Sequence, residues 1–310
     1  MATTKTKIAG IEFDSYVLNA SGARSSNFGE LEKIAQSESA AIIMKSCTVE
    51  PRKGNEMPRE ARLPFGYFQS QGLANIGYKA YLEFIPKLKK YKKPIIASVV
   101  GFSLDEYKIL VKAFQESEID LIEINLSCPN VRDEYAPFMY NFEKIEQLLD
   151  EISNLGAKPM GLKLPPYISY SLQEKMAKLI GKYPISFISC INSLGNSLII
   201  DPEKESVVIK ATEGYGGLSG EYIKPIALGN VRRFYELLKD EVAIMGIGGI
   251  KTGQEAFEFL LAGADAVQIG TTFIKEGPSC FKRINTELEE ILNRKGYSSI
   301  QEVKGKLKYF

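Results

Sequence analysis

The stretch VAIMGIGGI (residues 242–250), together with AVQIGTT (266–272), decides the fold. In each, a short apolar run passes directly into a turn containing glycine. Continuous apolar runs of this length are typical of strands that are buried on both faces of a parallel sheet. The two stretches therefore predict neighbouring parallel strands, each followed by a loop in which the backbone is closely accessible.

Similar apolar runs occur along the rest of the chain and alternate with amphipathic stretches. The other clear runs are Ala40–Met44, Pro94–Val100, Leu121–Ile124, Met160–Leu164 and Ile185–Ile191, and a weaker one is Tyr67–Ser70. Between them, apolar residues recur at helical spacing. Eight strands alternating with helices predict a (β/α)8 TIM barrel, which we expect to occupy residues 1–310 as one domain. A doubly wound sheet is the alternative, because periodicity alone does not separate the two folds.

Two segments interrupt the alternation of strands and helices. Lys7–Asn19 is predicted to form a hairpin ahead of the barrel. Leu198–Lys210 is predicted to form a second, inserted hairpin with Asp201 and Pro202 in its turn.

Composition excludes several classes of function. The formal net charge of +1 gives no electrostatic basis for binding nucleic acid or an anionic membrane. The chain contains no histidine, which excludes histidine-based triads and histidine metal sites. Its four cysteines form no CxxC pair, so we expect no metal site and a reducing, cytoplasmic location. No apolar run approaches the ~20 residues of a membrane span, and Met1–Phe13 lacks the apolar region of a signal peptide.

In a barrel of this kind, the active site is built by the loops after the strands. Glycines at 246, 248, 249 and 270, followed by Thr271, lie after the last two predicted strands, where barrel phosphate sites are commonly found. Asn125, Asn130 and Asn192 also follow strands and predict a planar, polar ligand. Ordinary tight turns and turn asparagines are the alternative interpretations.

Three ionisable side chains are candidates for chemistry at the barrel mouth. Cys128 follows a strand and lies among polar residues, whereas Cys190 lies inside an apolar run and fits an inert packing role. Lys45 and Lys163 lie at or within strand ends, where a buried ammonium needs an anionic partner.

The motif NLSCPN (125–130) resembles the soluble class 1 dihydroorotate dehydrogenases. Further similar stretches are LNASG (18–22), GLKLPPY (161–167), INS (191–193), GGLSG (216–220) and GIGGI (246–250). The resemblance covers essentially the whole chain, and GKLK (305–308) is more similar to the homodimeric 1A type, which passes electrons to fumarate. The membrane-bound class, by contrast, has a serine base and an N-terminal extension.

The resemblance implies FMN as cofactor, dihydroorotate and fumarate as substrates, and orotate as product. It implies that Cys128 is the base that removes a proton from C5 while hydride leaves C6. The implied substrate-binding residues are Lys45, Gln69, Gln71, Gly72, Leu73, Asn125, Asn130, Asn192 and Ser193. The implied FMN-binding residues are Ala20, Ser21, Gly22, Lys45, Ser46, Asn125, Lys163, Ile191, Gly220, Gly246, Gly248, Gly249, Gly270 and Thr271.

One departure from the family pattern affects the substrate loop. The family has Asn-Ser-Met-Gly-Leu where this chain has QSQGL (69–73), so Gln69 and Gln71 replace an asparagine and a methionine. An FMN oxidoreductase of the same fold with a shifted substrate is therefore the alternative function. A flavin-free sugar-phosphate isomerase or lyase and a non-catalytic barrel are further alternatives. Val131–Tyr140 lacks regular periodicity and is predicted to be a mobile lid over the site.

Overall fold

A computed structural model describes residues 2–127 and 138–310, apart from the side chain of Asp240. Its central feature is a sheet of eight parallel strands in the order β3-β16-β15-β10-β9-β8-β7-β4. These are β3 (Val17–Asn19), β4 (Ile42–Ile43), β7 (Ile95–Val99), β8 (Leu121–Asn125), β9 (Met160–Leu164), β10 (Ile185–Cys190), β15 (Ala243–Ile247) and β16 (Ala266–Ile269). This is the predicted TIM barrel, with β15 and β16 as its last two strands.

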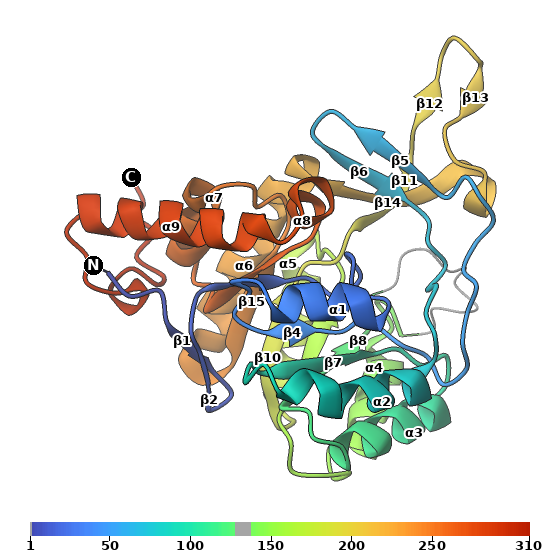
Figure 1. The fold of residues 1–310 in the computed structure, drawn as a ribbon, viewed down its shortest axis with the longest axis horizontal. Helices are drawn as coiled ribbons and strands as arrows, with labels where there is room; N and C mark the ends of the chain where they lie inside the picture. Colours follow the sequence, from blue (N-terminus) through green and yellow to red (C-terminus); the bar gives the residue numbers. More distant parts are fainter. Residues whose placement is uncertain (1, 128–137) are drawn as a thin grey trace.

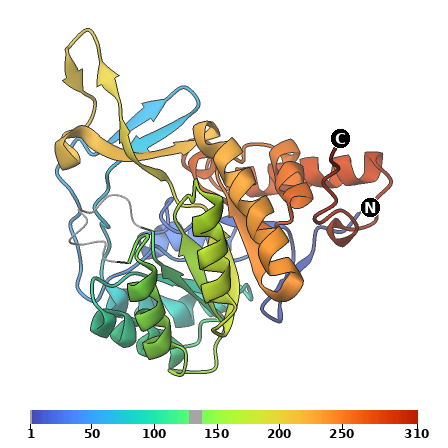
Figure 2. The ribbon, with the colours of Figure 1, turned by 180° about the vertical axis from the view of Figure 1, so that it is seen from behind.

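Helices surround the barrel on its outside (Figures 1 and 2). They are α1 (Phe28–Ala35), α2 (Tyr78–Lys89), α3 (Leu104–Gln115), α4 (Phe142–Ile152), α5 (Tyr170–Ile180), α6 (Lys224–Leu238), α7 (Gly253–Ala262), α8 (Thr271–Glu276) and α9 (Ser279–Arg294). Local signals fix several ends: the Ser103 side chain caps α3, and Thr252 and Glu255 form a capping box on α7. Short 3-10 turns lie at Ala211–Gly214, Glu221–Ile223, Lys239–Glu241 and Ile300–Glu302.

The seam between β3 and β4, the two end strands of this order, is joined by the Ala40 N–H, which donates to the Val17 carbonyl at 2.9 Å, and by the Asn19 side chain. The Asn19 amide donates from Nδ2 to the carbonyl of Ile43 at 2.8 Å and accepts the Ile43 N–H at 2.9 Å. Asn19 is fully buried, so it satisfies backbone groups that water cannot reach. The Asn19 side chain thereby replaces part of a backbone ladder at the seam.

The first barrel strand was wrongly assigned from the sequence. The N-terminal hairpin consists only of β1 (Thr6–Ile8) and β2 (Ile11–Phe13), and Val17–Asn19 is a parallel barrel strand. Tyr67–Ser70, predicted as a barrel strand, instead lies mostly in β6 (Gly66–Gln69) and pairs antiparallel with its neighbours. An apolar run of this length looks the same in either sheet, because strand direction is set by partners distant in sequence.

Strand β6 belongs to a four-stranded antiparallel sheet in the order β11-β14-β6-β5, here called the mouth sheet. The other members are β5 (Glu60–Leu63), β11 (Leu194–Leu198) and β14 (Tyr215–Gly220). Beyond β11, the strands β12 (Ile200–Asp201) and β13 (Ser206–Val207) form a hairpin that projects from the molecule (Figures 1 and 2). This confirms the hairpin predicted for Leu198–Lys210.

Within the described ranges, no helix combines the length and the apolar character that crossing a bilayer requires.

Candidate active site

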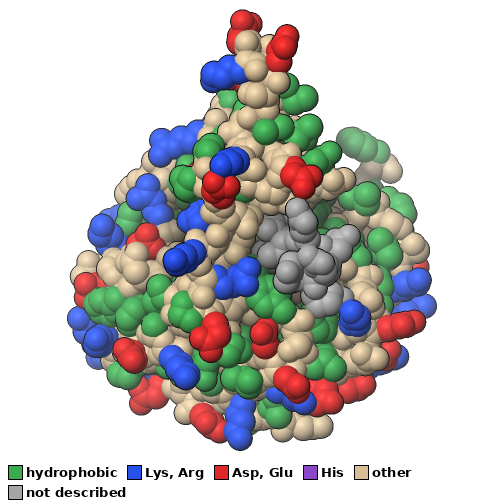
Figure 3. Space-filling view, turned by 90° about the vertical axis from the view of Figure 1, so that its right-hand side faces the viewer, with side chains coloured by type: hydrophobic (Ala, Val, Ile, Leu, Met, Phe, Trp, Pro, Cys, Tyr) green, Lys and Arg blue, Asp and Glu red, His purple; other side chains and the backbone are tan. Residues whose placement is uncertain are grey.

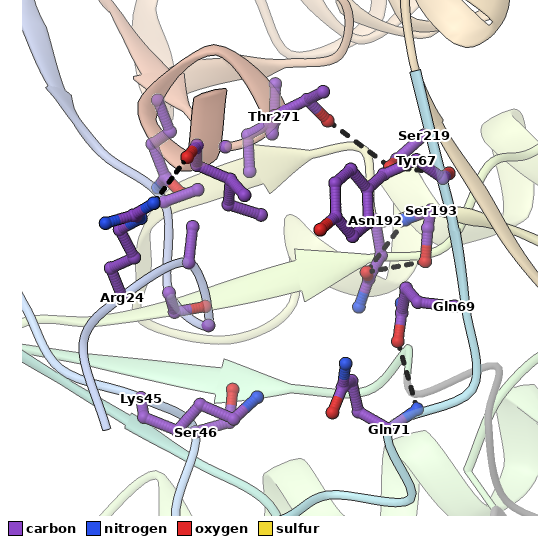
Figure 4. Close-up of a pocket in the computed structure, with 18 of the residues that line it drawn as sticks. Arg24, Lys45, Ser46, Tyr67, Gln69, Gln71, Asn192, Ser193, Ser219 and Thr271 are labelled. Atoms are coloured by element: carbon purple, nitrogen blue, oxygen red, sulfur yellow. Dashed lines mark hydrogen bonds between the residues drawn. The ribbon is translucent and has the colours of Figure 1, made fainter. Parts of the chain in front are cut away.

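A cavity of about 480 Å³ lies at the carboxyl ends of the barrel strands, with the mouth sheet forming part of its wall (Figure 4). Loops after β3, β4, β10, β15 and β16 contribute to it, together with residues at the ends of β8 and β9. Its volume is within the ~300–1,000 Å³ typical of small-molecule sites. The position is the one at which barrel enzymes bind their ligands.

The floor of this cavity carries a buried ammonium beside a buried amide. Lys163 and Asn125 are register partners on the neighbouring strands β9 and β8, and both are almost fully buried. The Lys163 ammonium donates to Ser21 Oγ at 2.9 Å, and Asn125 Nδ2 donates to Ser46 Oγ at 3.0 Å. The floor therefore offers a fixed positive charge and an oriented amide to a bound ligand.

The side wall carries a second oriented amide. Asn192 Nδ2 donates to the Ser127 carbonyl at 2.8 Å, and Asn192 Oδ1 accepts the Ser193 N–H at 2.8 Å (Figure 4). Because a backbone carbonyl only accepts and a backbone N–H only donates, these two contacts fix which end of the amide is which. Asn192 and Ser193 both line the cavity.

Another part of the cavity edge is formed by glycines with positive φ angles, which other residues rarely adopt. Gly248 and Gly249 have φ of +138° and +72°. A Cβ on Gly249 would lie 2.9 Å from the Gly220 carbonyl oxygen and 2.8 Å from Lys224 Cβ, so these loops pack closely enough to require glycine. Gly270 directly precedes α8, the kind of short extra helix that helps to form phosphate sites in barrels.

The structure brings most of the sequence-predicted site residues to this one cavity. The predicted site residues that line it are Ala20, Ser21, Gly22, Lys45, Ser46, Gln69, Gln71, Leu73, Asn125, Lys163, Ile191, Asn192, Ser193, Gly220, Gly248, Gly249, Gly270 and Thr271. Cys128 and Asn130 lie outside the described residues, as does most of the segment predicted to be a lid.

Two predicted glycines are not among the lining residues. Gly246 lies within β15, where a Cβ would come within 2.3 Å of the Phe259 ring. Gly72 has φ of +65°, and a Cβ there would lie 2.2 Å from the Asn55 side chain. Close packing accounts for both glycines, which were assigned from the sequence to cofactor and substrate contact.

The two glutamines that depart from the family pattern are tied into the mouth sheet. Gln69 Oε1 accepts the backbone N–H of Gln71 at 3.0 Å (Figure 4). Gln71 Nε2 donates to the Glu60 carboxylate on β5 at 2.6 Å. Both side chains line the cavity, so the loop presents polar groups to a ligand at this side.

Several residues near the cavity were not found from the sequence. Arg24, Arg59, Tyr67 and Gln268 line it, and Glu123 lies inside the barrel beneath it. Glu123 had one readable signal: it is a charged residue within an apolar run, two positions before Asn125 and thus on the same face of the strand.

The three cysteines in the described residues are all buried and unpaired. Burial raises the pKa of the Cys47 and Cys190 thiols well above the ordinary range, and it raises the pKa of Cys280 to about 12. They are therefore protonated and inert near neutral pH. The described residues also contain no group of acidic or cysteine side chains arranged to hold a metal ion.

The fold and the cavity define a TIM-barrel protein with a small-molecule site at the carboxyl ends of its strands. The sequence profile described as dihydroorotate dehydrogenase matches residues 3–292. The chain is 46% identical over 307 residues to dihydroorotate dehydrogenase A (fumarate) of Lactococcus lactis subsp. cremoris, covering 98% of each chain. It is equally identical, over 308 residues, to the protein of that name from Lactococcus lactis subsp. lactis, covering 98% of this chain and 99% of the other.

A solved structure gives the same result for the fold. The dihydroorotate dehydrogenase of Eimeria tenella aligns with a TM-score of 0.84 at 21% identity, covering 98% of this chain and 88% of the other. This chain belongs to the dihydroorotate dehydrogenase family, whose members are flavin-dependent oxidoreductases.

Proposed function

We propose that this protein oxidises dihydroorotate to orotate with bound FMN, and that fumarate reoxidises the cofactor. The observation that carries the proposal is the convergence of Lys163, Asn125, Asn192 and the glycines at 248 and 249 on one cavity. In a chain of this family, that set offers hydrogen bonds and charge to an isoalloxazine ring and a close backbone approach to a phosphate.

The residues present fit FMN. The floor offers a cation and an amide to the polar edge of a ring, and the edge after β15 and β16 offers backbone that side chains do not obstruct. Lys163, Asn125, Ser46 and Ser21 would hold the ring, and Gly249 with its neighbouring loops would hold the phosphate. When bound, FMN accepts the hydride that leaves C6 of dihydroorotate.

The chain's own groups supply the rest of the chemistry. Cys128 would take the proton from C5 as a thiolate, so that loss of H⁺ and H⁻ leaves the C5–C6 double bond of orotate. Lys45, Asn192 and Ser193 would orient the substrate over the ring. The buried cation Lys163 would stabilise negative charge that accumulates on the reduced cofactor.

The anaerobic visible spectrum of the purified protein tests this proposal directly. We expect a yellow protein that bleaches when dihydroorotate is added and recovers its colour when fumarate follows. A colourless protein, with no FMN in a denatured extract, would contradict it and favour the flavin-free isomerase or lyase. If dihydroorotate bleaches the protein but fumarate does not restore its colour, only the proposed electron acceptor is wrong.

The base is tested separately with Cys128→Ser. Serine has a much higher pKa than cysteine, so we expect turnover near neutral pH to fall by about 10²–10⁴-fold, the usual contribution of a general base. FMN content should not change. Unchanged turnover would remove Cys128 from the mechanism.

The glutamines support one alternative, an FMN oxidoreductase of this fold with a shifted substrate. Gln69 and Gln71 put amides where the family has a shorter amide and an apolar side chain. A protein that dithionite bleaches but dihydroorotate does not would favour this alternative. The resemblance to the 1A type also supports a homodimer in the cytoplasm, and light scattering of the purified protein tests the dimer.

A further inference from the structure

Glu123 lies inside the barrel below the cavity floor and is fully buried. Ser98 Oγ and Ser21 Oγ lie 2.9 and 3.0 Å from its Oε1, while Ser189 Oγ and Gln268 Nε2 lie 2.6 and 3.4 Å from its Oε2. In the described part of the chain, Glu123 and Lys163 are the only charged residues that are buried. A buried carboxylate is costly unless such donors surround it.

The first relay of hydrogen bonds runs from Lys163 to Glu123. The Lys163 ammonium, which can only donate, gives a hydrogen to Ser21 Oγ at 2.9 Å. The Ser21 hydroxyl then directs its own hydrogen to Glu123 Oε1. The two buried charges are therefore linked through a single hydroxyl, and the position of the cation depends on the carboxylate.

The second relay runs from Asn125 through two serines. Because the Ser127 N–H donates to Asn125 Oδ1 at 3.0 Å, the other end of the amide is Nδ2, which donates to Ser46 Oγ. The Ser46 and Ser98 hydroxyl oxygens lie 2.8 Å apart, and Ser98 in turn lies against Glu123. A hydroxyl has one hydrogen, so the donors follow one direction and end at the carboxylate.

We propose that Glu123 is a positioning residue for both cofactor and substrate, a role that rests on the function proposed above. It is the acceptor in which the relays from Lys163 and Asn125 end, and its negative charge offsets the buried ammonium on the floor. Glu123 therefore sets how strongly Lys163 favours the reduced, anionic cofactor. Through Asn125 and Ser127 it also steadies the Asn192 amide on the side wall.

Glu123→Gln tests this inference, because it keeps the size of the side chain and removes its charge. Without that charge, the Lys163 field on the cofactor is stronger, so the midpoint potential of bound FMN should move to a more positive value. We expect binding of reduced over oxidised FMN to rise by about tenfold, which is ~30 mV for a two-electron couple. Dye-coupled anaerobic titration measures this shift, and spectral titration with orotate should show about tenfold weaker binding, the equivalent of ~1.4 kcal/mol.

Ser189→Ala is the matched control. It removes one hydrogen bond to the same carboxylate and the one that Gln268 Nε2 donates to Ser189 Oγ, but it leaves the charge and both relays in place. The potential and the orotate affinity of this variant should equal those of the wild type, even if its melting temperature falls. If Glu123→Gln behaves like Ser189→Ala in both measurements, Glu123 only stabilises the fold and the inference is wrong.

Ser98→Ala keeps the inference testable if Glu123→Gln does not fold. It interrupts only the Asn125 relay and leaves the Glu123 charge and the Lys163 relay in place, so orotate should bind about tenfold more weakly while the FMN potential moves less than it does in Glu123→Gln. Unchanged orotate binding would overturn the inference. Wild-type protein that lacks FMN would overturn the proposed function, whereas FMN-bound wild type with unaltered variants would overturn the role of Glu123 alone.

Discussion

The barrel floor and the mouth sheet enclose the same cavity but are built differently. Floor residues such as Lys163 and Asn125 are buried and lie on the parallel strands β9 and β8. Chains of hydrogen bonds connect them to Glu123. Mouth-sheet strands such as β5 and β11 are partly exposed and come from insertions after β4 and β10. The residues proposed to hold the cofactor lie on the buried floor, whereas the departures from the family pattern, Gln69 and Gln71, lie at the mouth sheet.

This difference indicates that the floor and the mouth sheet have separate roles, the floor for the cofactor and the mouth sheet for the substrate. A floor with interlocked donors and acceptors tolerates little change, because each substitution leaves a buried partner unsatisfied. A partly exposed sheet can exchange side chains at lower cost. We therefore expect substrate preference to vary through the mouth sheet while the cofactor site stays the same.

Thiol reactivity gives the largest contrast between the barrel and its mouth. Cys47, Cys190 and Cys280 are buried with raised pKa values, so they should react with iodoacetamide at pH 8 only after the protein opens. Opening of a buried core costs several kcal/mol, so we expect reaction at least ~10³-fold slower than for an exposed thiol. Mass spectrometry over time should find fast labelling at Cys128 alone. Equally fast labelling of Cys190 would show that the barrel wall is not closed.

The seam of the barrel gives the next largest effect. Asn19→Ala removes the partner of both the N–H and the carbonyl of Ile43, each of which then stays buried and unsatisfied. At ~1–3 kcal/mol for each group, the free energy of unfolding should fall by about 2–6 kcal/mol in a urea titration. Asn27→Ala, which removes only the cap of α1, is the control and should cost about 1 kcal/mol. Equal losses in the two variants would mean that Asn19 does not hold the seam.

The strands of the floor were easier to predict from the sequence than those of the mouth sheet, because burial on both faces leaves a clear pattern. Strands buried on both faces leave continuous apolar runs, so seven barrel strands and the residues that follow them could be predicted. The eighth, Val17–Asn19, has only three residues and leaves no such run. Glu123 was missed because its one signal, a single charged residue within an apolar run, does not recur at a regular spacing.

The mouth sheet could not be predicted as a sheet. Strand β14 reads YGGLSG and contains three glycines, which are unfavourable in strands, and its partner β6 lies about 150 positions earlier in the chain. Pairing over such separations depends on the completed barrel rather than on local residues. The sequence did identify Gln69 and Gln71 as departures, but their contacts with each other and with Glu60 needed the structure.

Exchanging the two glutamines tests whether the mouth sheet sets substrate preference. Gln69→Asn with Gln71→Met removes one methylene and one polar side chain from the cavity wall. Relief of overpacking is worth ~1–3 kcal/mol, so kcat/KM for dihydroorotate should rise about tenfold or more. The FMN potential should not change, since the floor is untouched. If dihydroorotate turnover does not improve, the glutamines do not impair it and the shifted-substrate alternative loses its support.

The smallest effect is expected at the tip of the β12–β13 hairpin, which is exposed where the floor is buried. Charged side chains gather at this projecting tip (Figure 3), where Lys204 and Asp201 form an ion pair at 2.8 Å. The Lys204 side chain is 76% exposed, so solvent screens the pair. Lys204→Ala should therefore change the free energy of unfolding by less than ~0.5 kcal/mol and leave FMN content and kcat/KM at wild-type values. A loss of activity would mean that the hairpin influences the cavity through β11 and β14. The hairpin tip would then have to be counted among the parts of the molecule that affect substrate turnover.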